Sequence, residues 1–178
     1  MTRQLTEVNT LVGPLRFIWD DEALGLDAAG RICKGAVVRS EFGRTLREKG
    51  CTTVPAATAD GDLKFVIEAV EAWSSGSQVN ALDFVPVLQA GGEFRQKCWQ
   101  ALRSVKAGVA ISYGELAALA GNPAAGRAAG SAMATNTVAP FVPCHRVVRT
   151  DGSIGNYSAR GGSQTKVALL EHEGVEIA

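Results

Sequence analysis

The alternation of hydrophobic and polar residues divides the chain into a strand-rich first part and a helical second part. Short apolar runs separated by turn residues predict a small β-meander early in the chain. The predicted strands are 15–19, 23–26 and 32–38, and turns are predicted between them at 20–22 and 27–30. Apolar residues then recur at helical spacing over 62–73, and the apolar run 81–88 predicts a further strand. A glycine pair and a change in composition follow, so we expect two domains, 1–91 and 92–178.

The second domain is predicted to be mainly helical. Apolar residues within 94–105 share one face of a helix. The stretch Ser112-Tyr113-Gly114-Glu115 has the pattern of a capping box, which opens a second helix with Leu116 and Leu119 facing the core. A last helix is predicted from about 163 to 173.

A third helix of this domain is built almost wholly from small residues. Asn122 is its expected N-cap, Pro123 its first residue and Ala134 its last. Two interior glycines cost about 1 kcal/mol each relative to alanine and leave a smooth face with one long polar side chain, Arg127. With the preceding helix it has the spacing of a helix-turn-helix, and Arg127 is placed to replace a base removed from a nucleic-acid stack. A helical hairpin packed in the core, with Arg127 exposed by chance, is the alternative.

Charge changes sign near the predicted boundary. Residues 1–93 hold nine Lys and Arg against thirteen Asp and Glu, whereas 94–178 hold nine against five. Within 95–150 seven basic residues face a single Glu, which indicates a surface for a polyanion, with a solvated basic face as the alternative. No apolar run approaches the roughly 18 residues of a membrane span and no apolar signal core opens the chain, so we expect a cytoplasmic protein.

One of four cysteines stands out as a candidate nucleophile. The cysteines are Cys33, Cys51, Cys98 and Cys144. Their wide spacing fits no zinc motif, so we expect free thiols, no metal site and no cofactor. Cys144 lies in Pro143-Cys144-His145-Arg146-Val147, after the apolar run 138–142 that predicts a buried strand end. Arg146 and Arg149 are expected to lower the pKa of its thiol, and a buried, inert cysteine is the alternative.

Motifs between Phe94 and Gly174, taken in order, resemble those of the O6-alkylguanine-DNA alkyltransferases, also called methylated-DNA–protein-cysteine methyltransferases. The matching motifs are Phe94, Trp99-Gln100-Ala101-Leu102, Ser112-Tyr113-Gly114-Glu115-Leu116-Ala117, Gly121-Asn122, Arg127-Ala128, Asn136, Pro143-Cys144-His145-Arg146-Val147, Gly155-Asn156-Tyr157-Ser158 and His172-Glu173-Gly174. The first 90 residues match only in outline, as a small α/β domain.

This resemblance implies a fold and an activity. The fold is α+β: a small N-terminal α/β domain, ribonuclease-H-like, and a mainly helical, winged-helix-like C-terminal domain with a helix-turn-helix. The activity is DNA repair by direct reversal, in which a methyl or other alkyl group passes from O6 of guanine in duplex DNA to Cys144 once and irreversibly, without a cofactor. Acceptance of O4-alkylated thymine stays open. The partner is double-stranded DNA bound through its minor groove by a monomer, nucleoid-associated if the source is a prokaryote.

Residue roles follow from the same resemblance. Cys144 accepts the alkyl group. A water bridges Cys144 and His145, and Glu173 orients the imidazole of His145. Tyr113 helps to rotate the nucleotide and shares a proton with the leaving base, and Asn136 links the recognition helix to the active-site segment. The residues expected to contact DNA are Arg127, Tyr113, Gly114, Asn122 and Thr150, and those expected to line the base pocket are Met133, Val147, Tyr157 and Ser158.

Two other functions compete with repair. A helix-turn-helix regulator with a structural cysteine needs polar side chains along its recognition helix, and the helix here is mostly alanine and glycine. A cysteine hydrolase needs a histidine in reach of the thiol, whereas the side chains of Cys144 and His145 point to opposite sides of an extended segment.

Overall fold

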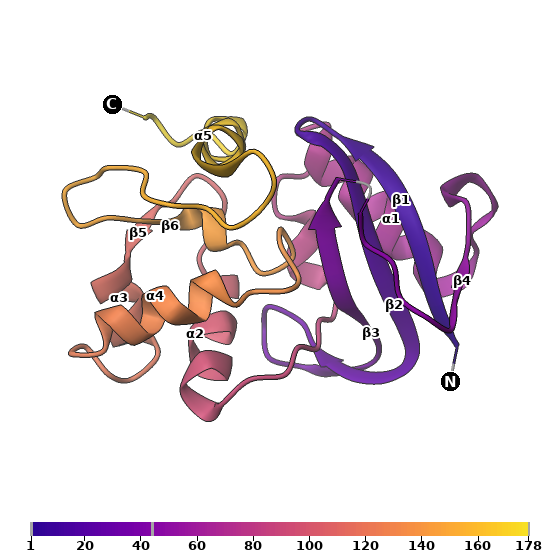
Figure 1. Cartoon of the computed structure of the whole chain (residues 1–178), viewed down its shortest axis with the longest axis horizontal. Coiled ribbons are helices and arrows are strands. Elements are labelled where there is room, and N and C mark those ends of the chain that lie inside the picture. The colour runs from indigo at the N-terminus through magenta and orange to yellow at the C-terminus, as the bar shows by residue number, and fades with distance from the viewer. Residues whose placement is uncertain (1, 44, 178) are drawn as a thin grey trace. The chain divides into compact units, whose positions relative to one another are not determined.

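The structure of the protein is a computed structural model that describes residues 2–43 and 45–177 (Figure 1). The chain forms two compact units, Met1–Gln89 with Thr137–Phe141, and Ala90–Asn136 with Val142–Ala178. The α+β class is confirmed. Whereas the sequence led us to expect two continuous domains, the chain returns to the first unit for the five residues Thr137–Phe141. None of the helices in the described part of the chain has the length and apolarity needed to cross a membrane.

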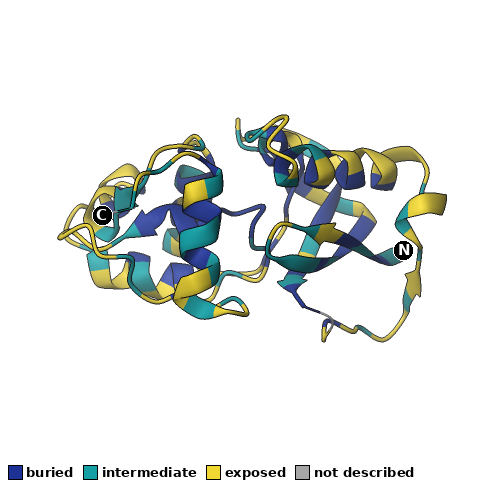
Figure 2. Ribbon diagram, turned by 90° about the horizontal axis from the view of Figure 1, so that it is seen from above, coloured by how far each residue is buried: buried dark blue, intermediate teal, exposed yellow. Residues whose placement is uncertain are grey.

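A four-stranded sheet forms the first unit. Its strands are β1 (Arg3–Thr10), β2 (Gly13–Leu26), β3 (Ile32–Phe42) and β4 (Cys51–Thr53). They are arranged in the order β3-β2-β1-β4, with β1 antiparallel to β2, β2 antiparallel to β3 and β4 parallel to β1. The short helix η1 (Ala56–Thr58) leads into α1 (Gly61–Ser74), which contacts β1. Figure 2 shows α1 with its buried positions turned toward the sheet and its exposed positions turned outward.

The helical stripe predicted for α1 is confirmed. The five apolar positions of that stripe, which are Leu63, Val66, Ile67, Val70 and Trp73, are all buried. Burying a large aliphatic or aromatic side chain contributes roughly 1.5–3 kcal/mol, so this face fixes the helix on the sheet.

The predicted turn at 20–22 is wrong, because β2 continues through it as an irregularity. The pairing of β2 with β3 shifts register between Asp20 and Leu24. The buried Asp20 carboxylate accepts the backbone N–H groups of Glu22 and Ala23 at 3.1 and 3.2 Å and the Arg3 guanidinium at 3.0 Å. The polar residues 20–22 therefore lie in a bulge of a continuous strand and not in a turn between two strands.

The strand predicted over 81–88 is also wrong. Ala81–Phe84 forms the 3₁₀ helix η2, and only Val87 beyond it makes isolated bridges, to Leu26 and Val37. A short apolar run does not distinguish a strand from another buried segment.

The second unit is mainly helical, as predicted. Its elements are α2 (Glu93–Arg103), β5 (Ile111–Ser112), α3 (Tyr113–Leu119), α4 (Gly126–Ala134), η3 (Cys144–Arg146), β6 (Val147–Val148) and α5 (Gly162–His172). The parallel pairs Ile111↔Val147 and Ser112↔Val148 join the strand before α3 to the strand after η3. The capping box of Ser112 and Glu115 is confirmed, with both of its hydrogen bonds present.

The connection between α3 and α4 differs from the prediction. Gly121, at φ +88°, ends α3, and the Asn122 N–H donates to Ala117 O at 2.9 Å, as in a Schellman motif. Because the Asn122 carbonyl accepts the Ala125 N–H in the turn that follows, α4 begins at Gly126 and not at Pro123.

The packing of α3 and α4 was partly predicted. Leu116 is buried as expected, but Leu119 is 58% exposed, so the inward prediction for Leu119 is wrong. A Cβ added at Gly126 would meet the backbone nitrogen of Gly114 at 3.9 Å, and one added at Gly130 would meet the Tyr113 ring at 3.8 Å. The small residues of α4 therefore bring its backbone close to the start of α3.

Candidate active site

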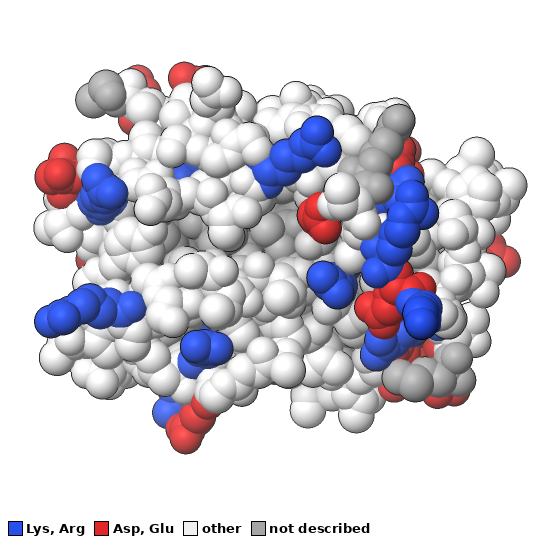
Figure 3. All heavy atoms as spheres, viewed as in Figure 1, with Lys and Arg blue, Asp and Glu red and all other residues white. Residues whose placement is uncertain are grey.

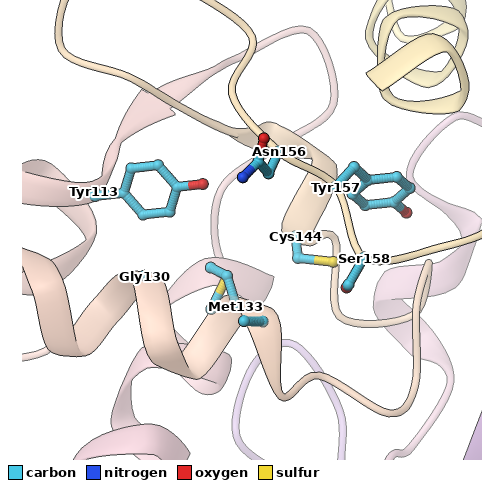
Figure 4. A pocket seen from close by; sticks show the side chains of 8 residues that line it. Tyr113, Gly130, Met133, Cys144, Asn156, Tyr157 and Ser158 are labelled. Carbon is cyan, nitrogen blue, oxygen red and sulfur yellow. The ribbon is translucent and has the colours of Figure 1, made fainter. Parts of the chain in front are cut away.

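A pocket of about 280 Å³ opens in the second unit. Its lining residues are Tyr113, Gly130, Met133, Ala134, Cys144, Asn156, Tyr157 and Ser158. Figure 4 shows the Tyr113 ring reaching toward the middle of the pocket from α3, while Cys144 lies across from it with its sulfur beside Ser158. The pocket thus places a phenol and a thiol on facing walls of a space near the lower end of ordinary ligand-pocket volumes.

Cys144 begins a helical turn and does not end a strand. Residues 138–142 form turns and bends, which contradicts the strand predicted there, and Cys144–Arg146 is the 3₁₀ helix η3. Residues 138–143 include two prolines, Pro140 and Pro143, and neither has a backbone N–H to donate to a neighbouring strand. The extended geometry assumed for Cys144 and His145 is therefore wrong, although no hydrogen bond joins their side chains among the described residues.

Asn136 fixes the thiol. Its side-chain Nδ2 donates to the Val142 carbonyl at 2.8 Å and to Cys144 Sγ at 3.1 Å. Because Asn136 lies two residues beyond the end of α4, these bonds join that helix to the segment that carries the sulfur. Cys144 is buried, with 5% of its surface exposed, so the thiol is held in place and little solvated.

The pKa of the Cys144 thiol is raised by burial, and the Asn136 hydrogen bond and the Lys166 charge act in the opposite direction. The expectation of a lowered pKa is therefore wrong. Lys166 is fully buried in α5, donates through Nζ to the Val147 carbonyl at 2.6 Å, and has its pKa lowered by burial to about 8. The sequence signal for this buried charge, which we missed, is that Lys166 directly precedes the apolar run 167–170 of α5.

Replacing Lys166 by methionine is expected to slow the alkylation of Cys144 severalfold at pH 7. The ammonium is charged below its pKa of about 8 and favours the thiolate, so the difference between the proteins should shrink as pH rises above 8. The rate is measured with iodoacetamide by the mass of the Cys144 peptide. Lys97→Met, which removes an exposed lysine, is the control, and equal rates for all three proteins at pH 7 would contradict the expectation.

Glu173 lies between His145 and Arg146. Its Oε1 is 3.0 Å from His145 Nε2, and Arg146 donates to both oxygens, at 2.7 Å from Nε and 2.9 Å from Nη2. Burial acts to raise the pKa of Glu173, but hydrogen bonds from His145 and Arg146 outweigh it and lower the pKa to about 2. Arg146 also donates through Nη1 to the Val105 carbonyl, so the carboxylate is held by a rigid partner.

The imidazole of His145 is neutral in this setting. Burial lowers its pKa, although the Glu173 hydrogen bond acts to raise it. Its Nδ1 is buried and has no hydrogen-bond partner within the described ranges. A neutral ring with one nitrogen turned to a carboxylate and the other unbound can accept a proton at that second nitrogen.

The part of the chain that carries this site is similar in sequence to known proteins. Residues 93–175 match the family model described as 6-O-methylguanine DNA methyltransferase, DNA binding domain. A methylated-DNA–protein-cysteine methyltransferase of Rattus norvegicus is 54% identical over 90 residues, which are 51% of this chain and 43% of the relative. The protein of the same name from Salmonella typhimurium is 42% identical over 93 residues, 52% of this chain and 53% of the relative. The crystal structure of Mycobacterium tuberculosis OGT in complex with DNA has a TM-score of 0.73 at 26% identity and covers 96% of this chain and 92% of that one. Residues 93–175 of this chain are thus similar to the DNA-binding domain of the O6-methylguanine DNA methyltransferases.

The family model and these two curated relatives each match about half of the chain. The aligned regions amount to about half of the length of these curated relatives, 43% and 53%. The structural likeness to the Mycobacterium tuberculosis protein extends over both units.

The pocket residues expected from the methyltransferase family are mostly brought together. Met133, Tyr157 and Ser158 line the pocket, as does Tyr113, whereas Val147 is fully buried outside the lining and contributes its carbonyl to Lys166. Three lining residues were not predicted, namely Gly130, Ala134 and Asn156. The smooth face of α4 and the Gly155-Asn156-Tyr157-Ser158 motif were the signals that could have identified them.

Four of the five residues that the family resemblance assigns to DNA are exposed, and the fifth, Tyr113, is half-buried and lines the pocket. Arg127 is exposed on the first turn of α4, and Gly114, Asn122 and Thr150 are exposed as well. On the face drawn in Figure 3, the Lys and Arg side chains of the second unit stand apart and do not form one continuous patch.

Fewer basic side chains reach the surface of this unit than the seven counted in the sequence. Of the seven basic residues in 95–150, Arg103 and Arg146 are buried, and Lys97 pairs with Glu93 at 2.7 Å. The sequence overestimated the positive surface because it could not separate internal arginines from exposed ones.

Proposed function

We propose that the protein repairs DNA by direct reversal, transferring a methyl or other alkyl group from O6 of guanine in duplex DNA to Cys144 Sγ. The observation that carries the proposal is the thiol held by Asn136 at 3.1 Å on one wall of a pocket with Tyr113 on the facing wall, in the part of the chain that matches the family. The reaction uses each protein molecule once and needs no cofactor.

The chemistry is substitution at a saturated carbon. The Cys144 thiolate attacks the alkyl carbon, a C–S bond forms, the C–O6 bond breaks and guanine leaves with the bonding electrons. Burial and the Cys144 charge raise the pKa of Tyr113, so its hydroxyl is protonated at neutral pH and can donate a hydrogen bond or a proton to the departing base. The thioether offers no leaving group for hydrolysis, which makes the transfer irreversible.

His145 and Glu173 prepare the nucleophile in this proposal. The thiol proton passes, through a water, to the unbound Nδ1 of His145. The imidazolium that forms is stabilised by Glu173, 3.0 Å from Nε2, and Arg146 keeps that carboxylate ionised and in place. The proton returns to the guanine anion, so the overall reaction is balanced without another reactant.

The second unit would hold the DNA. Its α3–turn–α4 arrangement supports a helix-turn-helix of the winged-helix type that binds the minor groove as a monomer, with α4 as the recognition helix. Arg127, exposed on α4, would fill the space of the guanine that enters the pocket. We assign the first unit to the ribonuclease-H-like domain expected for residues 1–91, and the protein to the cytoplasm or nucleoid.

The test of this function is intact-mass spectrometry after mixing with a duplex that contains O6-methylguanine. Each protein molecule should gain one methyl group in place of a hydrogen, and peptide mapping should place it on Cys144. Unchanged protein mass, a methyl group on another cysteine, or continued turnover after one equivalent would reject the proposal.

Replacing Arg127 by alanine should slow repair of duplex DNA at least tenfold more than reaction with free O6-benzylguanine. The side chain stabilises the gap left by the flipped nucleotide, and flipping costs a few kcal/mol that the free base does not incur. Single-turnover rates on both substrates measure the effect. The exposed Arg95 supplies a control with the same charge change, and equal losses on both substrates would place Arg127 in a structural role.

A further inference from the structure

Arg149 is placed beside the pocket by the pairing of two short strands. The parallel register Ile111↔Val147 and Ser112↔Val148 ends just before Tyr113 in one strand and Arg149 in the other. The two residues therefore emerge from the same end of the β5–β6 pair, one opening α3 and the other opening the loop that leads to Asn156.

The side chain of Arg149 is held along that loop. A Cβ added at Gly155 would lie 3.5 Å from Arg149 Cγ, 3.6 Å from Arg149 Nε and 3.9 Å from the Tyr113 hydroxyl oxygen. Hence the guanidinium nitrogen and the phenol oxygen both lie close to Gly155, and Tyr113 and the neighbouring Asn156 line the pocket. The Arg149 backbone is fixed as well, since its N–H donates to Ser153 O and its carbonyl accepts from the Gly152 N–H, both at 2.9 Å.

The guanidinium itself is unpaired. Arg149 is exposed, and within the described residues its side chain makes no hydrogen bond or ion pair. The neighbouring carboxylate of Asp151 accepts instead from the Ser153 N–H at 3.0 Å and the Ser153 hydroxyl at 2.7 Å. A planar guanidinium with five unpaired N–H donors beside the pocket suits an anion with several acceptor oxygens, such as a phosphate.

We propose that Arg149 binds the phosphodiester adjacent to the flipped nucleotide while the base occupies the pocket. This inference rests on the proposed function and adds to it a residue that recognises the nucleotide backbone. A base between Tyr113 and Cys144 leaves its sugar and phosphate at the pocket mouth, and a phosphate oxygen is the anion that accompanies every nucleotide.

The test combines a protein variant with a change in the DNA. Arg149→Ala and Arg149→Lys are compared with the wild type on lesion duplexes that carry either normal phosphates or an uncharged methylphosphonate at one of the two positions flanking the lesion. Free O6-benzylguanine is the substrate without phosphate. Arg95→Ala removes another exposed charge elsewhere on the unit and serves as the matched control.

Arg149→Ala should weaken duplex binding and slow duplex repair roughly tenfold, and lower the salt dependence of binding by about one counterion. The loss should disappear on the duplex with methylphosphonate at the contacted position, whereas the Arg95→Ala effect should be the same on all duplexes. Reaction with the free base should be unchanged. Arg149→Lys should retain part of the duplex rate, because it keeps the charge without the planar donor set.

Three results would overturn the inference. One is an Arg149→Ala loss of equal size on phosphate and on both methylphosphonate duplexes. Another is an equal loss on duplex and free base, which would place Arg149 on the leaving guanine or in the fold. The third is no loss at all. A wild-type protein that transfers no alkyl group from DNA or free base would overturn the proposed function as well, so the two failures are distinguishable.

Discussion

A Cys144→Ser protein is expected to take no methyl group from DNA, with transfer reduced at least about a thousandfold, while it still binds the lesion duplex. Serine keeps the shape of the side chain and can still accept the Asn136 hydrogen bond. Its hydroxyl does not ionise in this pocket, however, where burial already raises the pKa of the more acidic thiol. Intact mass measures the transfer, and a gel-shift titration measures the binding.

The other cysteines provide the controls for this variant. Cys33→Ser and Cys51→Ser change half-buried thiols of the first unit and should transfer at the wild-type rate. A methyl group that appears on the Cys144→Ser protein, at any position, would mean that the acceptor has been misassigned. Loss of both transfer and binding would instead indicate damage to the fold, which the thermal unfolding curve of the variant reports.

Replacing Glu173 by glutamine should destabilise the protein by about 3–5 kcal/mol. The substitution leaves the buried Arg146 guanidinium without its bidentate partner and takes the carboxylate from His145. Urea unfolding at pH 7 measures the loss. The double variant Arg146→Met/Glu173→Gln removes both charges and should be more stable than the single variant, because no uncompensated charge stays buried.

The same carboxylate predicts a dependence of stability on acid. Its pKa is about 2 in the folded protein against 4.5 for an unperturbed glutamate, so the ionised form contributes about 3 kcal/mol of stability above pH 4.5. That contribution should be lost as pH falls from 4.5 toward 2, where the folded protein must also bind the proton. Glu173→Gln should lose this component of the acid transition, and an unchanged acid slope in the variant would contradict the assignment.

Helices of both units could be predicted where their signals are local. The reciprocal bonds of Ser112 and Glu115 follow from side chains three residues apart, and α1 follows from one apolar stripe. The errors occur where distant groups decide the structure. The chain bulges at Asp20, whose carboxylate is satisfied by Arg3 and two backbone amides, and α4 begins three residues later than expected, after a turn closed by the Asn122 carbonyl.

Several of the residues that line the pocket were named from the sequence, whereas its electrostatics were not. The Cys144 motif and the terminal Glu173 were found by resemblance, and the structure brings His145 and Glu173 to 3.0 Å. The sequence attributed the tuning of the thiol to neighbouring arginines, whereas Arg146 is committed to Glu173 and the nearby charge comes from Lys166, more than twenty residues away. Sequence proximity is a poor guide to charge proximity when side chains leave a tight helical turn in different directions.

The brief return of the chain to the first unit limits how the protein can be engineered. A fragment cut at Ala90, which would keep the whole lining of the pocket, would carry Thr137–Phe141 without the unit to which this segment belongs. Ser40 would no longer bind the Thr137 and Ala139 carbonyls, and Phe141 would lose the edge-to-face contact with Phe17 at a 5.6 Å ring separation. The five residues that join Asn136 to Val142 would then be a loose tether directly ahead of the reactive sulfur. A compact tag or sensor derived from this chain should therefore replace Val138 and Phe141 with polar residues, or keep the first unit as its scaffold.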